Sequence, residues 1–191
     1  MCGIVGYVGE KQAANFLIDG LTKLEYRGYD SAGIAVFDGE KINVAKSVGR
    51  LAALKEKIKN NTPEGVMGIG HTRWATHGRP SDVNSHPHTD CSGKFAIVHN
   101  GIIENFMSLK EELIAKGHKF VSETDTEVVA HLIEDVYEGD FVEAVNKVLN
   151  RIEGSYSLAF MCQDYPDTLI CTKKDNPLVI GLGEGENFIA S

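Results

Sequence analysis

The sequence predicts an α+β protein folded as one domain. Short apolar segments of strand composition outnumber the helical patterns, and the helical patterns cluster between groups of strands. A length of 191 residues suits a single core. Two mainly antiparallel sheets with helices outside them fit this order of elements.

In the first part of the chain, each expected element follows from periodicity or from a turn signal. Asp38-Gly39 is a two-residue turn signal between two apolar runs, which predicts a hairpin. Apolar residues at helical spacing predict a helix before it and another after it. The expected elements are a strand over 4–8, a helix over 14–24, hairpin strands over 33–37 and 42–46, a helix over 51–58 and a strand over 66–72.

In the rest of the chain, a polar stretch over 73–93 separates two patterned regions, and a loop of that length favours a functional role. Gly117 is expected to end a helix, and Thr124 with Glu127 has capping-box spacing that predicts the start of the next one. The expected elements are a strand over 95–99, helices over 106–116, from 124 and over 141–152, and strands over 156–162, 168–172, 178–181 and 188–190.

Bulk composition excludes several classes of function. The net charge is −8 and no basic run offsets it, so we expect no nucleic-acid partner. The four cysteines have no paired spacing, which favours a reducing compartment. We expect no signal peptide, because the sequence does not begin with a basic region followed by a long apolar run. No apolar stretch approaches the ~18 residues of a membrane span. We therefore expect a cytoplasmic protein that makes no membrane contact.

Cys2 is the strongest candidate for a reactive residue, because it directly follows Met1. Removal of Met1 leaves a thiol, which titrates near pH ~8.5, and an α-amine, which titrates near pH ~7.7–8.0, on one residue. That residue then supplies both a nucleophile and a base. With Met1 retained, the nitrogen is an amide and we expect no activity. The alternative is a small buried residue at the start of a strand.

Other polar segments are weak signals when read alone. Asn100-Gly101 is more often a tight turn, and Asp125 more often a helix cap. The histidines of the central region lack a metal-binding spacing such as HExxH, so the sequence predicts no metal site and no cofactor. These histidines are His71, His77, His86 and His88.

Read together, the segments 2–6, 24–33, 71–78, 99–105 and 122–127 resemble the glutaminase domain of class II glutamine amidotransferases. The resemblance spans essentially the whole chain. Within this family it is most specific to the branch whose full-length enzymes aminate fructose 6-phosphate. It implies a four-layer αββα sandwich of the N-terminal nucleophile hydrolase type over residues 1–191.

The resemblance also implies the residues of a catalytic centre for L-glutamine. Cys2 would attack the side-chain amide, forming a γ-glutamyl thioester whose breakdown yields glutamate and ammonia. The Asn100 side chain and the Gly101 N–H would stabilise the oxyanion. Arg27 and Gly28 would orient the nucleophile.

The substrate-binding residues implied by the resemblance match the charges of free glutamine. Arg73 would hold the α-carboxylate and Asp125 the α-ammonium. Thr76 and His77 would line the same end, and Trp74 would belong to a loop that closes over the substrate.

For full-length enzymes of the branch that aminates fructose 6-phosphate, the resemblance implies a following isomerase domain that binds this sugar phosphate and uses the ammonia. That domain is absent from this chain, so we expect glutamine hydrolysis alone here and a homo-oligomer for the full-length enzyme. Three alternatives remain: a Cys–His hydrolase with His71, His77 or His99 as base, a regulatory module that binds an amino acid without turnover, and a dimerisation scaffold.

Overall fold

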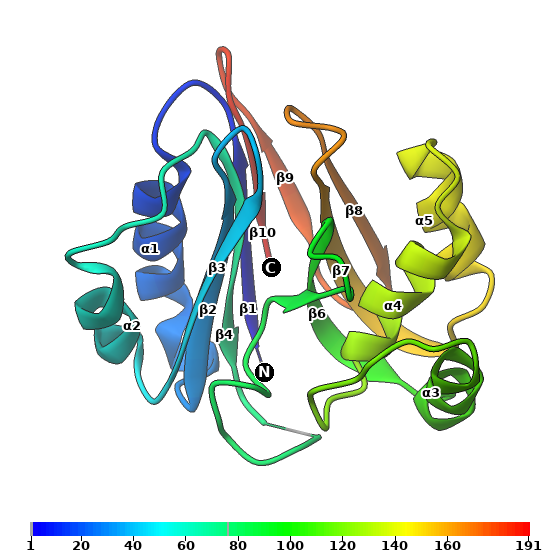
Figure 1. Cartoon of the computed structure of the whole chain (residues 1–191). Helices are drawn as coiled ribbons and strands as arrows, with labels where there is room; N and C mark the ends of the chain where they lie inside the picture. The colour runs from blue at the N-terminus through cyan, green and yellow to red at the C-terminus, as the bar shows by residue number, and fades with distance from the viewer. Residues whose placement is uncertain (1, 76) are drawn as a thin grey trace.

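The computed structural model describes residues 2–75 and 77–191, so Met1 and Thr76 lie outside the described residues. The chain forms two antiparallel sheets that pack face to face, and helices cover both outer faces (Figure 1). The predicted four-layer αββα sandwich is therefore confirmed. None of the helices in the described residues combines the length and the apolar character needed to cross a bilayer.

The first sheet has six strands in the order β3-β2-β4-β1-β10-β9. Its strands are β1 (Gly3–Val8), β2 (Ser31–Phe37), β3 (Ile42–Val48), β4 (Met67–Arg73), β9 (Val179–Leu182) and β10 (Asn187–Ala190). Helices α1 (Ala13–Leu24) and α2 (Leu51–Ile58) cover its outer face, and the short 3₁₀ helix η1 (Glu25–Arg27) follows α1 (Figure 1).

The second sheet has four strands in the order β5-β6-β7-β8. Its strands are β5 (His88–Thr89), β6 (Phe95–Ile103), β7 (Gly154–Cys162) and β8 (Leu169–Lys174). Its outer face is covered by α3 (Phe106–Ala115), α4 (Glu127–Val136) and α5 (Phe141–Leu149) (Figure 1).

The central strands are apolar on both faces because each face is buried in a different layer of core. Along β2, Ile34 and Val36 pack under α1 and α2, whereas Ala35 and Phe37 face the opposing sheet. Successive side chains of a strand point to opposite faces, so a continuous apolar run serves both layers. Each fully buried aliphatic side chain contributes about 1.5–3 kcal/mol to folding, which makes these strands a firm support for the site.

Four expectations about local structure need correction. The hairpin turn has four residues, 38–41, and not the two that Asp38-Gly39 signals. Phe37 pairs with Ile42, and the Asp38 carboxylate accepts two backbone N–H groups within the turn. Asn100-Gly101 lies inside β6 rather than in a turn. Helix α4 begins at Glu127 and α5 ends at Leu149. The other predicted helices and strands are present within a few residues of the expected bounds.

The capping box predicted for α4 is replaced by a different arrangement. The Glu127 carboxylate accepts the N–H groups of Val121 and Ser122, at 2.8 and 2.7 Å, instead of the N–H of Thr124. A capping box would bind the N–H of Thr124, whereas Glu127 binds N–H groups two and three residues before it.

Candidate active site

The Cys2 thiol is held beside the end of β4 by the antiparallel pairing of β1 with that strand. Gly3 pairs with Thr72, which brings Cys2 next to Trp74. The Trp74 N–H donates to the Cys2 Sγ at 3.2 Å, and the thiol lies 3.5 Å from the Trp74 carbonyl oxygen. Burial raises the pKa of the Cys2 thiol, although the Trp74 N–H acts in the opposite direction. A thiol in this state needs a base before it can attack.

The backbone that contacts the thiol is fixed by Gly28 and Asp30. A Cβ on Gly28 would lie 2.7 Å from the carbonyl carbon of Arg73, so only glycine allows this approach. The Asp30 N–H donates to the Arg73 carbonyl at 3.2 Å, and its carboxylate accepts the Ala75 N–H. Gly28 and Asp30 therefore support the Cys2 thiol indirectly, through segment 73–75. Arg27 lines the cavity itself, and its expected role in orienting Cys2 stays a prediction.

Asn100 faces Cys2 from the opposing sheet, at the position where β6 passes the end of β1. Its Nδ2 donates to the Cys2 carbonyl oxygen and to the Ser191 hydroxyl, each at 3.0 Å, and its Oδ1 accepts from His71 Nε2 at 2.9 Å. Gly101 has φ +125°. A Cβ there would lie 2.0 Å from the Ser155 carbonyl oxygen. Glycine is thus required by the backbone and by the neighbouring strand.

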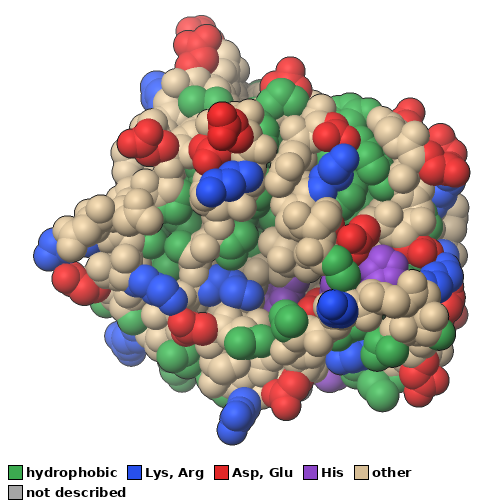
Figure 2. Space-filling view, viewed as in Figure 1, with side chains coloured by type: hydrophobic (Ala, Val, Ile, Leu, Met, Phe, Trp, Pro, Cys, Tyr) green, Lys and Arg blue, Asp and Glu red, His purple; other side chains and the backbone are tan. Residues whose placement is uncertain are grey.

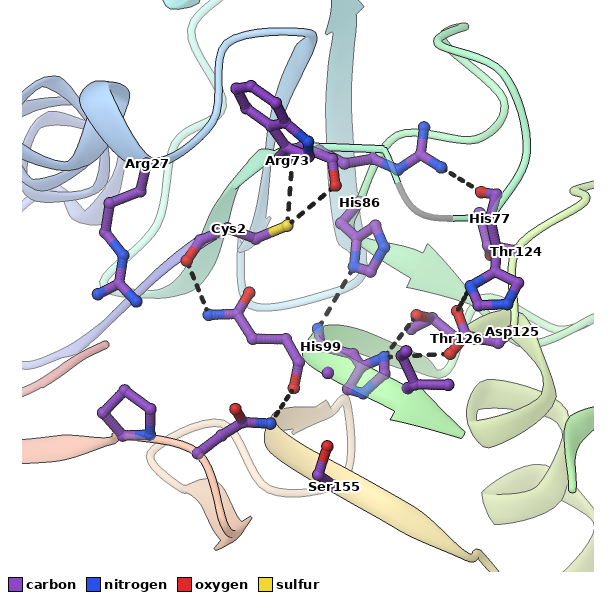
Figure 3. A pocket seen from close by; sticks show the side chains of 16 residues that line it. Cys2, Arg27, Arg73, His77, His86, His99, Thr124, Asp125, Thr126 and Ser155 are labelled. Carbon is purple, nitrogen blue, oxygen red and sulfur yellow. Dashed lines mark hydrogen bonds and ion pairs between the residues drawn. The ribbon is translucent and has the colours of Figure 1, made fainter. Parts of the chain in front are cut away.

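A cavity of about 290 Å³ opens in front of Cys2 and brings together most of the residues that the sequence singled out (Figure 3). Its lining combines a thiol, cations, an anion and amide groups. The sequence-predicted residues on its wall are Cys2, Arg27, Arg73, Trp74, His77, Asn100, Gly101 and Asp125. Thr76 lies outside the described residues. Gly28 is not among the lining residues and packs against the backbone of Arg73, which is.

Arg73 and Asp125 supply one cation and one anion to this cavity, and both are nearly fully buried. The Arg73 Nη2 donates to the carbonyl oxygens of His77 and Gly78, whereas its buried Nη1 has no partner among the described residues. The Asp125 Oδ2 accepts the Ile103 N–H at 2.8 Å, and its Oδ1 lies 4.0 Å from His77 Nδ1. Both charged groups are held in place by the backbone around them.

Trp74 lies at the rim of the cavity. Its side chain is 48% exposed and packs edge-on against Tyr29, with 5.3 Å between the ring centroids. The expectation that Trp74 belongs to a loop that closes over the substrate stays a prediction.

Four buried histidines surround the back of the site. Burial lowers the pKa of His71 to about 3 and that of His99 to about 4, and it holds the pKa values of His86 and His88 well below their usual range. They are weak bases in this setting. In the described residues the Cys2 Sγ makes hydrogen bonds only to Trp74, which argues against a Cys–His pair.

Several cavity residues were not singled out as site residues from the sequence. His86, Thr124, Thr126, Ser155, Asn176 and Pro177 line the cavity. Of these, Thr126 contacts the His99 Nδ1 through its hydroxyl at 2.8 Å, and the Asn176 side chain donates to the Asn100 carbonyl at 3.3 Å. Thr124 and Thr126 flank Asp125, which is the one signal in the sequence that pointed to them.

Comparison with known proteins agrees with this geometry. Residues 71–191, more than half of the chain, match the family model described as "Glutamine amidotransferase domain". The chain belongs to the glutamine amidotransferase domain family. This amidotransferase domain is 61% identical over its whole length to a glutamine–fructose-6-phosphate aminotransferase (isomerizing) of Caldanaerobacter subterraneus, and 56% identical to one of Clostridium tetani. It spans 31% of the length of each of these relatives.

Among solved structures, the amidotransferase domain is similar to glutamine phosphoribosylpyrophosphate amidotransferase from B. subtilis. The TM-score is 0.85 with 30% sequence identity, and the match covers 99% of this chain and 41% of that one. The N-terminal nucleophile hydrolase architecture expected from the sequence is therefore confirmed by a relative of known structure.

Proposed function

We propose that this amidotransferase domain hydrolyses L-glutamine to L-glutamate and ammonia with the Cys2 sulfur as nucleophile. The observation that carries the proposal is one cavity that holds the thiol together with the Arg73 cation, the Asp125 anion and the Asn100 amide. A free amino acid with an amide side chain presents the complementary groups: a carboxylate, an ammonium and a carbonyl.

The chemistry has two halves. The Cys2 sulfur bonds to the side-chain amide carbon of glutamine, and the thiol proton passes to the α-amine that removal of Met1 exposes, directly or through a water. The carbon–nitrogen bond then breaks, and the proton leaves with ammonia. Water attacks the resulting γ-glutamyl thioester, which releases glutamate and restores the thiol.

The Asn100 Nδ2 and the Gly101 N–H are our candidates for stabilising the oxyanion of each tetrahedral intermediate. Both Nδ2 hydrogens are engaged, by the Cys2 carbonyl and by Ser191, so one of these bonds must be exchanged for the oxyanion. Removing one oxyanion donor typically raises the barrier by ~2.7–4 kcal/mol.

Substrate recognition rests on the two buried charges. The Arg73 Nη1 is a buried donor without a partner among the described residues, and a substrate carboxylate would satisfy it. The Asp125 carboxylate would take the α-ammonium. Trp74 at the rim would close over the bound amino acid. His77 would line the same end as Arg73 and Asp125, which is also the role expected of Thr76.

The decisive experiment compares three forms of the domain in a steady-state glutaminase assay, with intact mass confirming the N-terminus of each. The mature domain starting at Cys2 should turn over glutamine. Cys2→Ser in the same frame, and a form with Met1 retained, should both fall to background. Equal turnover by either of them would overturn the proposal.

At the level of the whole protein, we propose that residues 1–191 are one domain of a longer, homo-oligomeric enzyme. In it the ammonia would pass to an isomerase domain that converts fructose 6-phosphate to glucosamine 6-phosphate. The support is the name shared by the relatives and the fraction of their length that this domain spans. Glucosamine 6-phosphate formation by the isolated domain would contradict this division of labour.

A further inference from the structure

A second group of reactive side chains lies away from the glutaminase cavity. Cys91, His118, His131 and Glu134 each bring one ligand atom to a common point, and these four atoms all lie within 4.8 Å of one another. Cys91 follows β5, His118 lies between α3 and α4, and the other two are on α4. In Figure 2, histidine and acidic side chains lie side by side on the surface over the region of α4.

Three of the six ligand-atom distances within this Cys-His-His-Glu cluster are close to those around a tetrahedral metal ion. The His131 Nδ1 lies 3.5 Å from the Cys91 Sγ and 3.5 Å from the Glu134 Oε2, and the His118 Nδ1 lies 3.0 Å from the same Oε2. Metal bonds of 2.0–2.3 Å at tetrahedral angles place neighbouring ligand atoms about 3.3–3.7 Å apart. These three contacts need shifts of a few tenths of an ångström to match, and the remaining pairs, which lie within 4.8 Å, would have to shorten by at most about 1.5 Å.

The outer nitrogen of each imidazole faces a second carboxylate. The His131 Nε2 lies 3.5 Å from the Glu127 Oε1, and the His118 Nε2 lies 3.7 Å from the Asp135 Oδ1. Metal-bound histidines usually donate their other N–H to such a carboxylate, which fixes the tautomer that binds through Nδ1. In addition, the Lys119 N–H points at the Cys91 Sγ at 3.4 Å, a contact that stabilises a thiolate.

A metal ion accounts for the contacts of all four ring nitrogens. His118 and His131 each have a carboxylate oxygen near both ring nitrogens, which suits a ring that binds a cation through one nitrogen and donates its N–H from the other. A cation at the common point would accept the Nδ1 lone pairs and the Glu134 oxygen, and would leave both Nε2–H groups for the outer carboxylates.

We propose that Cys91, His118, His131 and Glu134 bind one Zn²⁺ ion. A thiolate with two imidazoles favours zinc over Mg²⁺ or Ca²⁺, and four protein ligands describe a closed, structural site. On binding, the Cys91 thiol loses its proton to solvent and no group changes oxidation state. The sequence predicts no metal site. These ligands are spread over 44 positions and only His131 and Glu134 share a helix face, so their spacing gives no signal of one.

The ion would tie together segments that are otherwise joined by loops. Glu127, the outer partner of His131, also holds the N–H of Ser122 at 2.7 Å and its hydroxyl at 2.6 Å. Ser122 begins the segment that carries Asp125 to the glutaminase cavity. Zinc would therefore stabilise the start of α4 and the loop that leads to the proposed ammonium site.

The test uses the domain with Cys2→Ala as the parent, so that the active-site thiol cannot bind metal. After chelator treatment and refilling, elemental analysis should give one zinc per chain, with a zinc-dependent rise in the thermal midpoint. Titration with Co²⁺ should give a thiolate-to-cobalt charge-transfer band and visible bands of tetrahedral intensity. Failure to take up one equivalent would overturn the proposal.

Variants locate the ion. Cys91→Ser should abolish the charge-transfer band and the thermal shift. Cys171→Ser, the same change at a partly accessible thiol outside the cluster, should preserve both. Asp135→Asn should weaken zinc binding roughly 10- to 100-fold through His118. A Cys91→Ser domain with an unchanged cobalt band would assign the metal elsewhere. Far-ultraviolet circular dichroism of each apo variant checks that it is folded, and Glu134→Gln gives a second route to loss of the site.

Discussion

His71 on one sheet donates from Nε2 to the Oδ1 of Asn100 on the other, at 2.9 Å. The same nitrogen lies 3.0 Å from the His99 carbonyl oxygen. Because both neighbours are acceptors, Nε2 carries the hydrogen, and burial lowers the pKa of His71 to about 3, which keeps the ring neutral. The Asn100 amide is therefore held with its oxygen toward His71 and its NH₂ toward Cys2.

We expect His71→Phe to reduce kcat for glutamine about 10- to 100-fold while changing KM little, because Asn100 loses the contact that orients its NH₂ group. Asn100→Ala should cost more, on the order of 10²–10³-fold. In the double variant the two losses should not add, since both act through one amide. An additive double variant, or unchanged kcat in His71→Phe, would contradict this role for His71.

Gly28→Ala tests the backbone support of the nucleophile. The added Cβ would meet the Arg73 carbonyl carbon at 2.7 Å and push away the segment that contacts the Cys2 Sγ. Because displacement of a reacting group by about 1 Å costs on the order of 10²-fold in rate, we expect a 10- to 100-fold loss of kcat/KM.

The control is Gly181→Ala on β9, where the new Cβ would lie 3.5 Å from the nearest atom, an ordinary contact with Phe188. It should leave both kcat and KM as they are. Equal activity of the two alanine variants would show that close packing at position 28 does not position the thiol.

The fold was largely predictable from local pattern. Apolar runs bounded by glycine and polar residues marked almost every strand, and the resemblance supplied the αββα layering that composition cannot give. Asn100-Gly101 shows where local signals fail: the pair is a common turn, but pairing with β7 over nine residues keeps it in a strand. Tertiary contact overrides the local preference there.

The site was predictable only where it coincides with a motif. Cys2, Arg73 and Asp125 stood in recognised segments, whereas His71 was considered as a base or a metal ligand and not as the group that orients Asn100. Nothing in the spacing of Cys91 and His118 indicated that they converge, because their proximity depends on how β5 and α4 pack against β6.

Asp125→Asn should raise KM for glutamine about 10- to 100-fold with a smaller effect on kcat. The variant retains an oxygen that can accept the Ile103 N–H, but it loses the charge proposed to bind the substrate ammonium. Hydrogen bonds to charged groups are worth about 1.5–3 kcal/mol, which sets this range.

A substrate analogue separates recognition from folding. The analogue is glutamine without its α-amino group, the monoamide of glutaric acid. With it, the parent domain and Asp125→Asn should have similar kcat/KM values. If the variant is impaired equally toward both substrates, Asp125 acts on something other than the ammonium.

The buried histidines predict how stability depends on pH. His71, His86, His88 and His99 have folded pKa values far below the ~6.5 of an unfolded chain. The unfolded state therefore binds protons first as the pH falls. Their contribution is fully present above pH ~6.5 and is lost progressively as the pH drops toward the folded values, about 4 for His99 and about 3 for His71.

Each such histidine adds a slope of at most ~1.4 kcal/mol per pH unit to the free energy of unfolding. Urea unfolding between pH 7 and 5, with a chelator present to exclude metal effects, should show a steep fall in stability. Asp and Glu titrate mostly below this window. His71→Phe removes one titrating group. The slope of its free energy of unfolding against pH should therefore be shallower by up to ~1.4 kcal/mol per pH unit, which corresponds to one proton, whatever its absolute stability. A flat profile for the parent over this range would mean that these imidazoles are not buried in neutral form.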